Sequence, residues 1–345
     1  MLRLRHPTAT IEAMQPMRGG LFTAPLMALT VVFASLLPAT VARGATTPTL
    51  RLLTEPGAGI APIDALFSGA KRSVDLVVYE LADPHLEAIL ADDSARGVKV
   101  RVLLDRGDEE SHNAAAYAYL EAHHVPVRWA SDPGIDLTHE KAAVIDNTTA
   151  LVMTLNLVAD DYATTRDFAV VDIDRADVGA IERVFTADWA GVPVGPVTGA
   201  DLVWSPGAEA ALVRVIDGAQ HTLLVENEEM ADPYITAPLE AAARRGVRVE
   251  VVMTVSSSWD SAFDALAKAG VAVRTYSESA ALYIHAKAMV ADAGTNEATA
   301  FVGSQNFSIT SLVHNRELGI VTDSSAIVSG IASAIAEDWS GARPW

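Results

Sequence analysis

The chain contains one eight-residue pattern twice, HEKAAVID at residues 139–146 and HAKAMVAD at residues 285–292, and both copies match His-x-Lys-x-x-x-x-Asp. Only five lysines occur among the 345 residues, and two of them, Lys141 and Lys287, stand in these frames. A single match of this kind can arise by chance, whereas two matches at equivalent points of a repeat indicate a common origin. The pattern therefore predicts a duplicated fold.

The segments that precede the two frames repeat as well. LTEPGAGIAPIDALFSGAKRSVDLVVYEL begins at residue 53 and VWSPGAEAALVRVIDGAQHTLLVENEEM at residue 203, and each combines a Pro-Gly-Ala turn, a helical pattern and a β-like run. The β-like runs end near Glu80 and Glu226, which both lie 59 residues before the histidine of their frame. We therefore expect these two glutamates to be equivalent, and either to line a site or to make structural hydrogen bonds. The helices that follow differ by a three-residue insertion.

An Asp-Pro pair marks a helix start in both copies, at residues 83–84 and 232–233. Aspartate accepts from free backbone N–H groups at a helix N-terminus, and proline fits the first turn, where no donor is needed. Gly97 and Gly246 are expected to end these helices, and β-branched strands follow. This alternation predicts α/β layers with a largely buried sheet in each copy, and a twofold-like pair would bring equivalent loops together in one composite site.

The first 45 residues are typical of an export signal. Arginines precede an apolar run at residues 21–38, and small residues then allow cleavage after Gly44 or Ala45. An uncleaved membrane anchor is the alternative, but the run is shorter than the roughly 20 residues of a span, and polar residues and prolines interrupt it. We therefore predict a secreted or periplasmic protein with a signal peptide at residues 1–45.

A Gly- and Pro-rich segment at residues 190–201 is expected to link the two copies. It gives two predicted domains after the signal peptide, an N-terminal repeat at residues 46–195 and a C-terminal repeat at residues 196–345.

Composition narrows the class of protein. Half of the residues are hydrophobic and 20% are charged, which provides a sizeable core. Cysteine is absent, which excludes disulfides, thiolate nucleophiles and cysteine metal sites. The formal net charge is −19 and becomes −22 without residues 1–44, which hold four arginines and one glutamate. An acidic exported protein repels nucleic acid at long range, and the longest basic run is only ARRGVR at residues 243–248. Nucleic acid is therefore not the expected partner.

The frames carry residues suited to a phosphodiester. Side chains two apart on a strand point the same way, so each frame projects its histidine and lysine together. Two ammonium groups can neutralise the non-bridging oxygens, while one imidazole attacks phosphorus and the other protonates the departing alkoxide. Histidine fits both tasks because its ordinary pKa is about 6.5. This scheme requires no metal and no other cofactor, since the lysines supply the positive charge.

Each frame is followed by a hydroxyl, an amide and an acid at matching positions. Hydroxyl and amide groups can donate to phosphate oxygens. A carboxylate that accepts the far ring N–H would fix the tautomer of each histidine and strengthen its basicity. The predicted phosphate-binding residues are Thr154, Asn156, Ser304 and Asn306, and the predicted acids are Asp167 and Glu317, each 11 residues after its asparagine.

The two frames, their followers and the duplication resemble the phospholipase D superfamily over roughly residues 50–340. The resemblance implies two α/β sandwich domains with a pseudo-twofold shared active site, and a metal-free, two-step phosphoryl transfer through a phosphohistidine. It implies that His139 is the nucleophile and that His285 acts first as general acid and then as base. The remaining implied site residues are Lys141, Lys287, Asp167 and Glu317 as catalytic groups, and Asp146 and Asp292 as groups that hold the strand and turn.

The two copies differ beside the predicted phosphate site. The first has Met153-Thr154 where the second has Gly303-Ser304, and Thr165 stands where the second has Asn315. Methionine in place of glycine is expected to crowd the phosphate side, so the first half-site could be slower or differently shaped.

The expected function is that of an exported phospholipase D that hydrolyses phospholipid headgroup esters to phosphatidic acid and alcohol. The expected partners are a phospholipid substrate and, transiently, a membrane or lipid aggregate surface, and we expect a monomer. A cardiolipin-synthase-like phosphatidyltransferase uses the same residues and stays open. Two further alternatives are a secreted nuclease, which would need a basic groove several phosphates long, and a non-catalytic binding or envelope protein.

Overall fold

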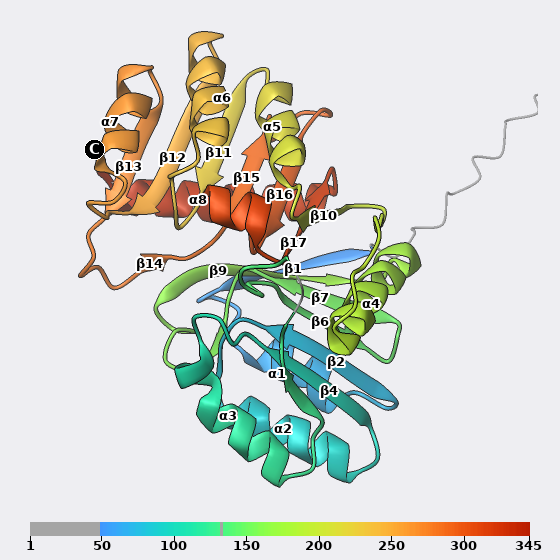
Figure 1. Ribbon diagram of the computed structural model, residues 1–345. Coiled ribbons are helices and arrows are strands. Elements are labelled where there is room, and N and C mark those ends of the chain that lie inside the picture. Colours follow the sequence, from blue (N-terminus) through green and yellow to red (C-terminus); the bar gives the residue numbers. More distant parts are fainter. Residues whose placement is uncertain (1–48, 132–133) are drawn as a thin grey trace, which may run out of the picture. The chain divides into compact units, whose positions relative to one another are not determined.

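The computed structural model describes residues 49–131 and 134–345 (Figure 1). The signal peptide predicted at residues 1–45 lies outside the described residues. The described chain contains two large sheets with equivalent strand orders, β1-β9-β7-β6-β2-β4-β5 and β10-β17-β16-β15-β11-β12-β13, the second of which is extended by β18. The predicted duplication and the α/β fold class are therefore confirmed.

The first half contains one large sheet, a two-stranded sheet formed by β3 and β8, and four helices. Its strands are β1 (Leu50–Glu55), β2 (Ser73–Val78), β3 (Leu81–Ala82), β4 (Lys99–Leu104), β5 (Val127–Trp129), β6 (Lys141–Ile145), β7 (Thr149–Met153), β8 (Leu157–Val158) and β9 (Thr165–Asp172). Its helices are α1 (Ala61–Ser68), α2 (Pro84–Ala95), α3 (Glu110–Ala122) and α4 (Arg175–Ala190).

The second half repeats this order without the two-stranded sheet. Its strands are β10 (Leu202–Ser205), β11 (Thr222–Glu226), β12 (Arg248–Thr254), β13 (Ala272–Tyr276), β14 (Tyr283–Ile284), β15 (Ala288–Ala291), β16 (Thr299–Gly303), β17 (Glu317–Thr322) and β18 (Arg343–Pro344). Its helices are α5 (Glu209–Gly218), α6 (Pro233–Arg244), α7 (Asp260–Lys268), the short π-helix at Thr310–His314 and α8 (Ser325–Gly341). The linker predicted at residues 190–201 falls between the end of α4 and the start of β10.

The predicted helix starts and ends are confirmed. Asp83 accepts hydrogen bonds from the backbone N–H groups of His85 and Leu86, and Asp232 accepts one from that of Tyr234. Gly97 and Gly246 follow the two helices with φ of 93° and 92°, values that glycine adopts without strain. These caps set the position at which β4 and β12 return into their sheets.

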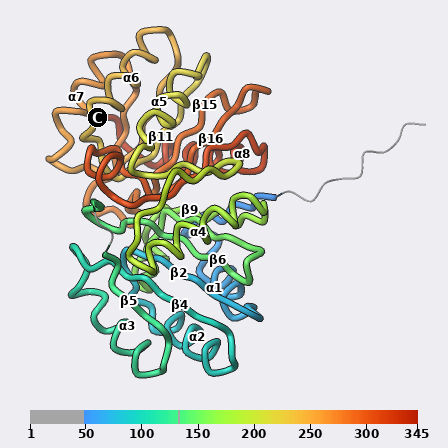
Figure 2. Tube along the Cα trace, turned by 45° about the vertical axis from the view of Figure 1, so that its right-hand side comes forward, coloured from blue at the N-terminus to red at the C-terminus, as the bar shows by residue number. Residues whose placement is uncertain are grey.

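Each large sheet is covered on one face by its own helices. The first sheet is covered by α1, α2 and α3. The second is covered by α5, α6 and α7, which lie side by side in both views (Figures 1 and 2). The opposite faces of both sheets contribute to a single apolar cluster with α4 and α8. Gly330 lets α8 approach β1, since a Cβ there would lie 2.6 Å from the Leu52 side chain.

Backbone hydrogen bonds also join the two halves near the two frames. β14 pairs in parallel with β9, with Tyr283 opposite Thr165 and Ile284 opposite Arg166. The equivalent contact in the other direction is the hydrogen bond from the backbone N–H of Arg316 to the carbonyl of Leu137, 2.9 Å long. In the part of the chain that the structure describes, none of the helices has the length and apolar character required to cross a membrane.

Candidate active site

The first frame places its histidine and lysine where the first sheet meets the second half. His139 lies just before β6, and Lys141 is the first residue of that strand. The Lys141 ammonium donates to the carbonyl of His139 at 2.8 Å. The Nδ1 atom of His139 lies 2.9 Å from a carboxylate oxygen of Glu317, which belongs to the second half. The residue His139 is 8% exposed and Lys141 is fully buried.

The second frame makes the reciprocal contact. His285 Nδ1 lies 2.9 Å from a carboxylate oxygen of Asp167, which belongs to the first half, and Lys287 donates to the carbonyl of His285 at 2.6 Å. Each histidine is thus held by the acid of the opposite half, an exchange that the sequence spacing does not reveal. A carboxylate on Nδ1 leaves Nε2 of each ring for chemistry.

Buried side chains hold both acids in place. Thr154 donates to Asp167 at 2.5 Å and accepts from the backbone N–H of Phe168, so its hydroxyl lies behind the acid. Glu317 accepts from Ser311 at 2.6 Å and from Asn315 at 3.3 Å. The two acids are therefore fixed by different neighbours.

The other predicted phosphate-binding residues lie in the same region. Ser304 is fully buried, and its hydroxyl accepts from the backbone N–H of Leu318 at 3.1 Å, so it stabilises β17. Asn156 and Asn306 each contain a buried amide oxygen that has no hydrogen-bond partner among the described residues. Such groups are uncommon in folded proteins, and a bound group that donates a hydrogen bond can satisfy them.

The motif aspartates face away from the histidines. Asp146 accepts from the backbone N–H groups of Lys71, Arg72 and Ser73 at 2.6–3.0 Å. Asp292 makes the equivalent contacts with the backbone N–H groups of residues 220–222. Both aspartates adopt a positive φ, 56° and 50°, which aspartate tolerates better than most residues. These residues tie the end of the strand to the turn before β2 or β11.

Burial and charge set the protonation of the site. Burial lowers the pKa of Lys141 to about 7, and the nearby Lys287 contributes to this shift. Burial also lowers the pKa of His139, although Glu317 opposes the change. Burial alone would raise the pKa of Asp167, but His285 and Lys287 outweigh it and hold that pKa below its ordinary value. A neutral His139 and an ionised Asp167 result.

A family model described as "Cardiolipin synthase, PLD-like domain" matches the chain twice, at residues 63–189 and 212–339. The two matches together cover well over half of the chain and include one frame each. The chain belongs to the phospholipase D superfamily. This match confirms the resemblance of the two frames to that superfamily.

Two curated relatives resemble part of the chain, and two solved structures resemble its fold. Mitochondrial cardiolipin hydrolases of Xenopus tropicalis and Xenopus laevis are 31% and 29% identical over 120 and 121 residues, which is 35% of this chain. The chain spans 56% of the length of these relatives. A phosphatidylserine synthase structure from Haemophilus influenzae Rd KW20 covers 86% of this chain and 87% of its own, with a TM-score of 0.67 and 12% identity. A polyphosphate kinase structure from Porphyromonas gingivalis covers 83% of this chain and 46% of its own, with a TM-score of 0.64 and 16% identity. These two structures share the fold.

The register of the strands corrects the expected equivalence of Glu80 and Glu226 in the two phospholipase D halves. Val77 faces Ala142 across β2 and β6, whereas Glu226 faces Ala288 across β11 and β15. Glu226 is therefore equivalent to Val77 and not to Glu80, and the equal intervals of 59 residues are a coincidence. The three-residue difference lies between the strands β4 and β5, where α3 has 13 residues and its counterpart α7 has nine.

The corrected register identifies two residues that sequence reasoning missed. Tyr79 and Glu228 are equivalent, and each contacts the histidine and lysine of its own half. The Tyr79 ring centroid lies 4.5 Å from that of His139, and the Lys141 Nζ lies 4.8 Å from the Tyr79 ring centroid. Correct placement of the three-residue difference would have aligned YE at residues 79–80 with EE at residues 228–229.

Glu228 lies among residues predicted to bind and react with a phosphodiester. Its carboxylate accepts from Lys287 at 2.9 Å and from the Asn306 amide at 3.4 Å, and lies 3.6 Å from Nε2 of His285. Burial alone would raise the pKa of Glu228, but Lys287 and His285 outweigh it, and His139 adds to the effect, so that pKa lies far below its ordinary value. Glu228 is thus within the electrostatic reach of both histidines, one from each half.

Glu226, in contrast, lies outside the site. It is fully buried near the ion pair between Arg166 and Asp338, whose closest atoms lie 2.5 Å apart. Burial and Asp338 raise the pKa of Glu226 well above its ordinary value. The equivalent cross-half pair, Arg316 and Asp188, has two hydrogen bonds of 3.0 Å. The sequence repeats an arginine before each orienting acid and an Asp-Trp pair in the last helix, and this repetition was the available signal for both pairs.

Met153 also departs from the expectation. It was expected to crowd the phosphate side, but its fully buried side chain packs in the apolar core of the first half. The equivalent Gly303 allows a close approach, since a Cβ there would lie 2.4 Å from Gly319 Cα and 2.5 Å from the Gln305 side chain. The difference is therefore one of core packing behind the site.

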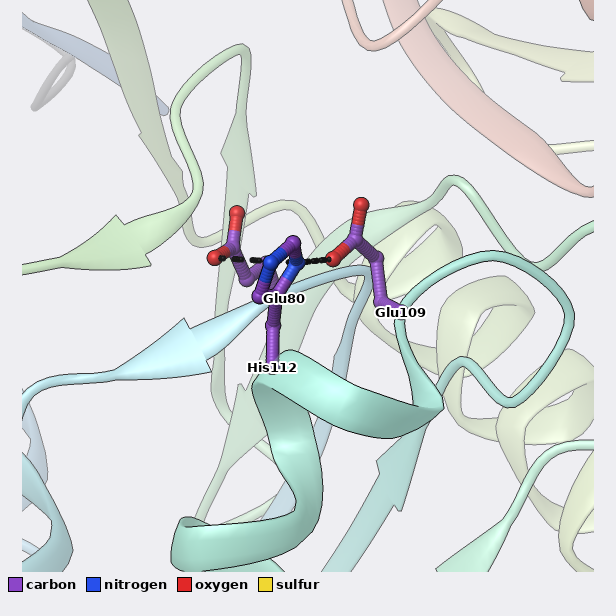
Figure 3. A group of neighbouring side chains, drawn as sticks. All are labelled: Glu80, Glu109 and His112. Atoms are coloured by element: carbon purple, nitrogen blue, oxygen red, sulfur yellow. Dashed lines mark hydrogen bonds and ion pairs between the residues drawn. The ribbon is translucent and has the colours of Figure 1, made fainter.

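Among the described residues, one side-chain group could offer three ligands to a metal ion, namely Glu80, Glu109 and His112 (Figure 3). The His112 ring already makes a short contact with Glu109, and this contact raises the pKa of the exposed imidazole. The group lies near Tyr79, which interacts with Glu109, and we call this group the rim. It includes none of the frame residues. The two histidines of the frames face carboxylates and lysines instead.

Proposed function

We propose that the protein is a phosphodiesterase of the phospholipase D type, which transfers a phosphatidyl group from a phospholipid to water through a phosphohistidine. The observation that carries this proposal is the reciprocal pairing of His139 with Glu317 and of His285 with Asp167, each at 2.9 Å, beside two fully buried lysines. Two imidazoles with fixed tautomers and two ammonium groups supply a nucleophile, a proton donor and charge stabilisation for a phosphodiester.

In the proposed first step, Nε2 of His139 attacks phosphorus and the bond from phosphorus to the alcohol oxygen breaks. The lowered pKa of His139 supports this assignment, because only the neutral imidazole has a lone pair to donate. His285 takes the complementary role of proton donor, with Asp167 2.9 Å from its Nδ1 and Glu228 3.6 Å from its Nε2. Its Nε2 proton passes to the departing alkoxide.

In the proposed second step, His285 accepts a proton from water, and the resulting hydroxide attacks the phosphohistidine. The bond from phosphorus to His139 breaks, which releases phosphatidic acid and restores the neutral imidazole. Lys141 and Lys287 neutralise the non-bridging oxygens in both steps. An alcohol in place of water would give transphosphatidylation with the same residues.

A lipid substrate is favoured over nucleic acid by charge. The formal net charge is −19, and the rim near Tyr79 contains the carboxylates of Glu80 and Glu109. A polyanion several phosphates long would be repelled by this surface. A single diester at a lipid surface needs only the two lysines.

The decisive experiment incubates the purified protein with phosphatidylcholine vesicles and, separately, with plasmid DNA, each with EDTA. We expect release of the headgroup alcohol that persists in EDTA, and intact DNA. Added ethanol separates hydrolysis from transfer, because transfer yields phosphatidylethanol. Strict dependence on a divalent metal, or cleavage of DNA but not of lipid, would overturn the proposal.

We also propose that the protein is exported after removal of its first 45 residues and acts as a monomer. The support for export is the basic front and apolar run in the sequence. Expression with a C-terminal tag, followed by N-terminal sequencing of the extracytoplasmic fraction and light scattering, tests both points. A tagged protein that stays inside the cell at full length would contradict export, and a dimer mass would contradict the monomer.

A further inference from the structure

A pocket of about 310 Å³ lies in the second half, and its lining includes Glu228, Glu229, Glu278, Trp259 and Tyr283. Two of these residues connect it to the catalytic groups. Glu228 contacts Lys287, and the Tyr283 ring centroid lies 6.4 Å from that of His285. The Tyr283 hydroxyl donates to Glu228 at 3.0 Å, which holds that carboxylate at the boundary between the pocket and the site.

The lining combines negative charge with aromatic rings. It contains three carboxylates and no lysine or arginine among the residues that the structure describes. Burial raises the pKa of Glu229, and the adjacent Glu228 raises it further, so a cation placed here would relieve the repulsion. Tyr283 remains 38% exposed, and Trp259 lies at the same pocket. Carboxylates and aromatic faces together are the environment that binds an ammonium group.

The position of the pocket relates it to one end of the substrate. In the proposed function, on which this inference rests, His285 donates its proton to the departing alcohol, so that alcohol must lie on the His285 side. Glu228 lines the pocket and lies 3.6 Å from Nε2 of His285, whereas the ring of Tyr79 packs against His139. The group that enters the pocket is therefore the leaving alcohol of the headgroup.

Substrate binding would also change the partners of Glu228. A phosphodiester that binds Lys287 displaces Glu228 from its 2.9 Å ion pair and leaves that carboxylate beside a second anion. An ammonium group on the leaving alcohol restores a cation to Glu228, whereas a neutral or anionic headgroup does not. The three carboxylates of the pocket, Glu228 with Glu229 and Glu278 behind it, therefore penalise together those substrates whose headgroup lacks positive charge.

We propose that this pocket is the leaving-alcohol subsite and that it selects phospholipids whose headgroup alcohol bears an ammonium group. Choline and ethanolamine esters share this chemistry. A headgroup with a second phosphate, as in cardiolipin, carries the opposite charge and is disfavoured.

The test compares kcat/KM for phosphatidylcholine, phosphatidylethanolamine and phosphatidylglycerol with identical short acyl chains in neutral detergent micelles. We expect the wild-type protein to prefer both ammonium headgroups over glycerol by about tenfold. The double variant Glu229→Gln, Glu278→Gln is expected to lose most of this preference while its turnover of phosphatidylglycerol stays within about twofold. The matched control is Glu80→Gln, because Glu80 is equivalent to Glu229 in the first half, and it should keep the preference.

The outcomes separate this inference from the function on which it rests. Equal cleavage of the three lipids by the wild-type protein, or an unchanged preference in the double variant, would overturn the ammonium subsite and leave the phospholipase proposal standing. Cleavage of none of the lipids would overturn the phospholipase proposal itself. A preference for choline alone would overturn selection by the shared ammonium charge, because ethanolamine carries the same charge.

Discussion

The two halves of the active site share their scaffold and differ in one neighbour. Both have a buried lysine that donates to the histidine carbonyl, and both have an acid from the opposite half on Nδ1. Beside the first pair lies the ring of Tyr79, and beside the second lies the carboxylate of Glu228. The aromatic ring packs against His139, and the carboxylate places a second negative charge near His285.

This difference shows how the two halves of a duplicated site can take different roles. The repeated residues place the same functional groups in both half-sites, so they do not indicate which imidazole attacks phosphorus and which donates a proton. A ring and a carboxylate at equivalent positions create the asymmetry that separate roles require. The following predictions test whether the two half-sites differ in the way that these neighbours imply.

The largest effect is expected for the two histidines themselves. His139→Ala and His285→Ala should each reduce turnover of phosphatidylcholine by about 10³-fold or more, since the imidazoles act in succession on one phosphorus. The variants should diverge on a p-nitrophenyl phosphodiester, whose leaving group needs no proton. His285→Ala should then show a burst of nitrophenolate in stopped-flow absorbance, and His139→Ala should show none. A burst in the opposite variant would exchange the two roles.

The crossed acids come next. Asp167→Asn should lower turnover by about 10²-fold or more and should behave like His285→Ala, although Asp167 lies in the same half as His139. Glu317→Gln should likewise behave like His139→Ala. The burst assay is the measurement, and double-mutant cycles check it, because each acid should be non-additive only with the histidine of the other half. Coupling within one half would contradict the crossed arrangement.

The sequence was sufficient to predict which residues gather at the candidate site. It did not predict which half supplies the acid for each histidine. The spacing of each frame predicted that histidine and lysine project together, and the intervals after the frames predicted Asp167 and Glu317. Repeats, however, identify equivalent residues and carry no information about which copy supplies a partner. The exchange of acids depends on the packing of β9 and β17 between the halves, which is a tertiary property.

The site neighbours were missed for a different reason. Glu80 and Glu226 gave a plausible match by interval alone, but strand register overrules intervals, because a shift of three residues moves a side chain to another place on the sheet. Tyr79 and Glu228 also differ in residue type, so similarity does not align them. Met153 was misplaced because the strand pattern did not show which face enters the core.

A smaller effect is expected from pH. Burial lowers the pKa of Lys141 to about 7, so in the free protein its positive charge is present below that pH and is lost above it. The value of kcat/KM should therefore fall about tenfold per pH unit above roughly pH 7. A bound phosphodiester favours the charged lysine and raises its pKa, so the decline in kcat should appear at higher pH.

Initial rates between pH 5 and 10 at saturating and limiting substrate give both profiles, and Lys141→Met is the control, which should lack the alkaline decline in its residual activity. Profiles of kcat/KM and kcat that decline at the same pH would contradict a substrate-dependent lysine. Flat profiles over this range would remove Lys141 from the charge stabilisation altogether.

The smallest effect concerns a position at which the two halves should not differ. Asp146 and Asp292 each accept three backbone N–H groups, and neither contacts a frame histidine. Asp146→Ala and Asp292→Ala should each lower the free energy of unfolding by about 1–2 kcal/mol, since the contacts are partly exposed. Urea denaturation followed by circular dichroism measures the loss, and kcat should remain within about threefold.

Asparagine provides the matched control for these turns, because it keeps one acceptor oxygen and tolerates a positive φ. Asp146→Asn and Asp292→Asn should therefore recover part of the lost stability in both halves. A loss of kcat without a loss of stability would give these aspartates a role in the chemistry. Unequal losses would mean that the asymmetry of the active site extends into the turns, beyond Tyr79 and Glu228.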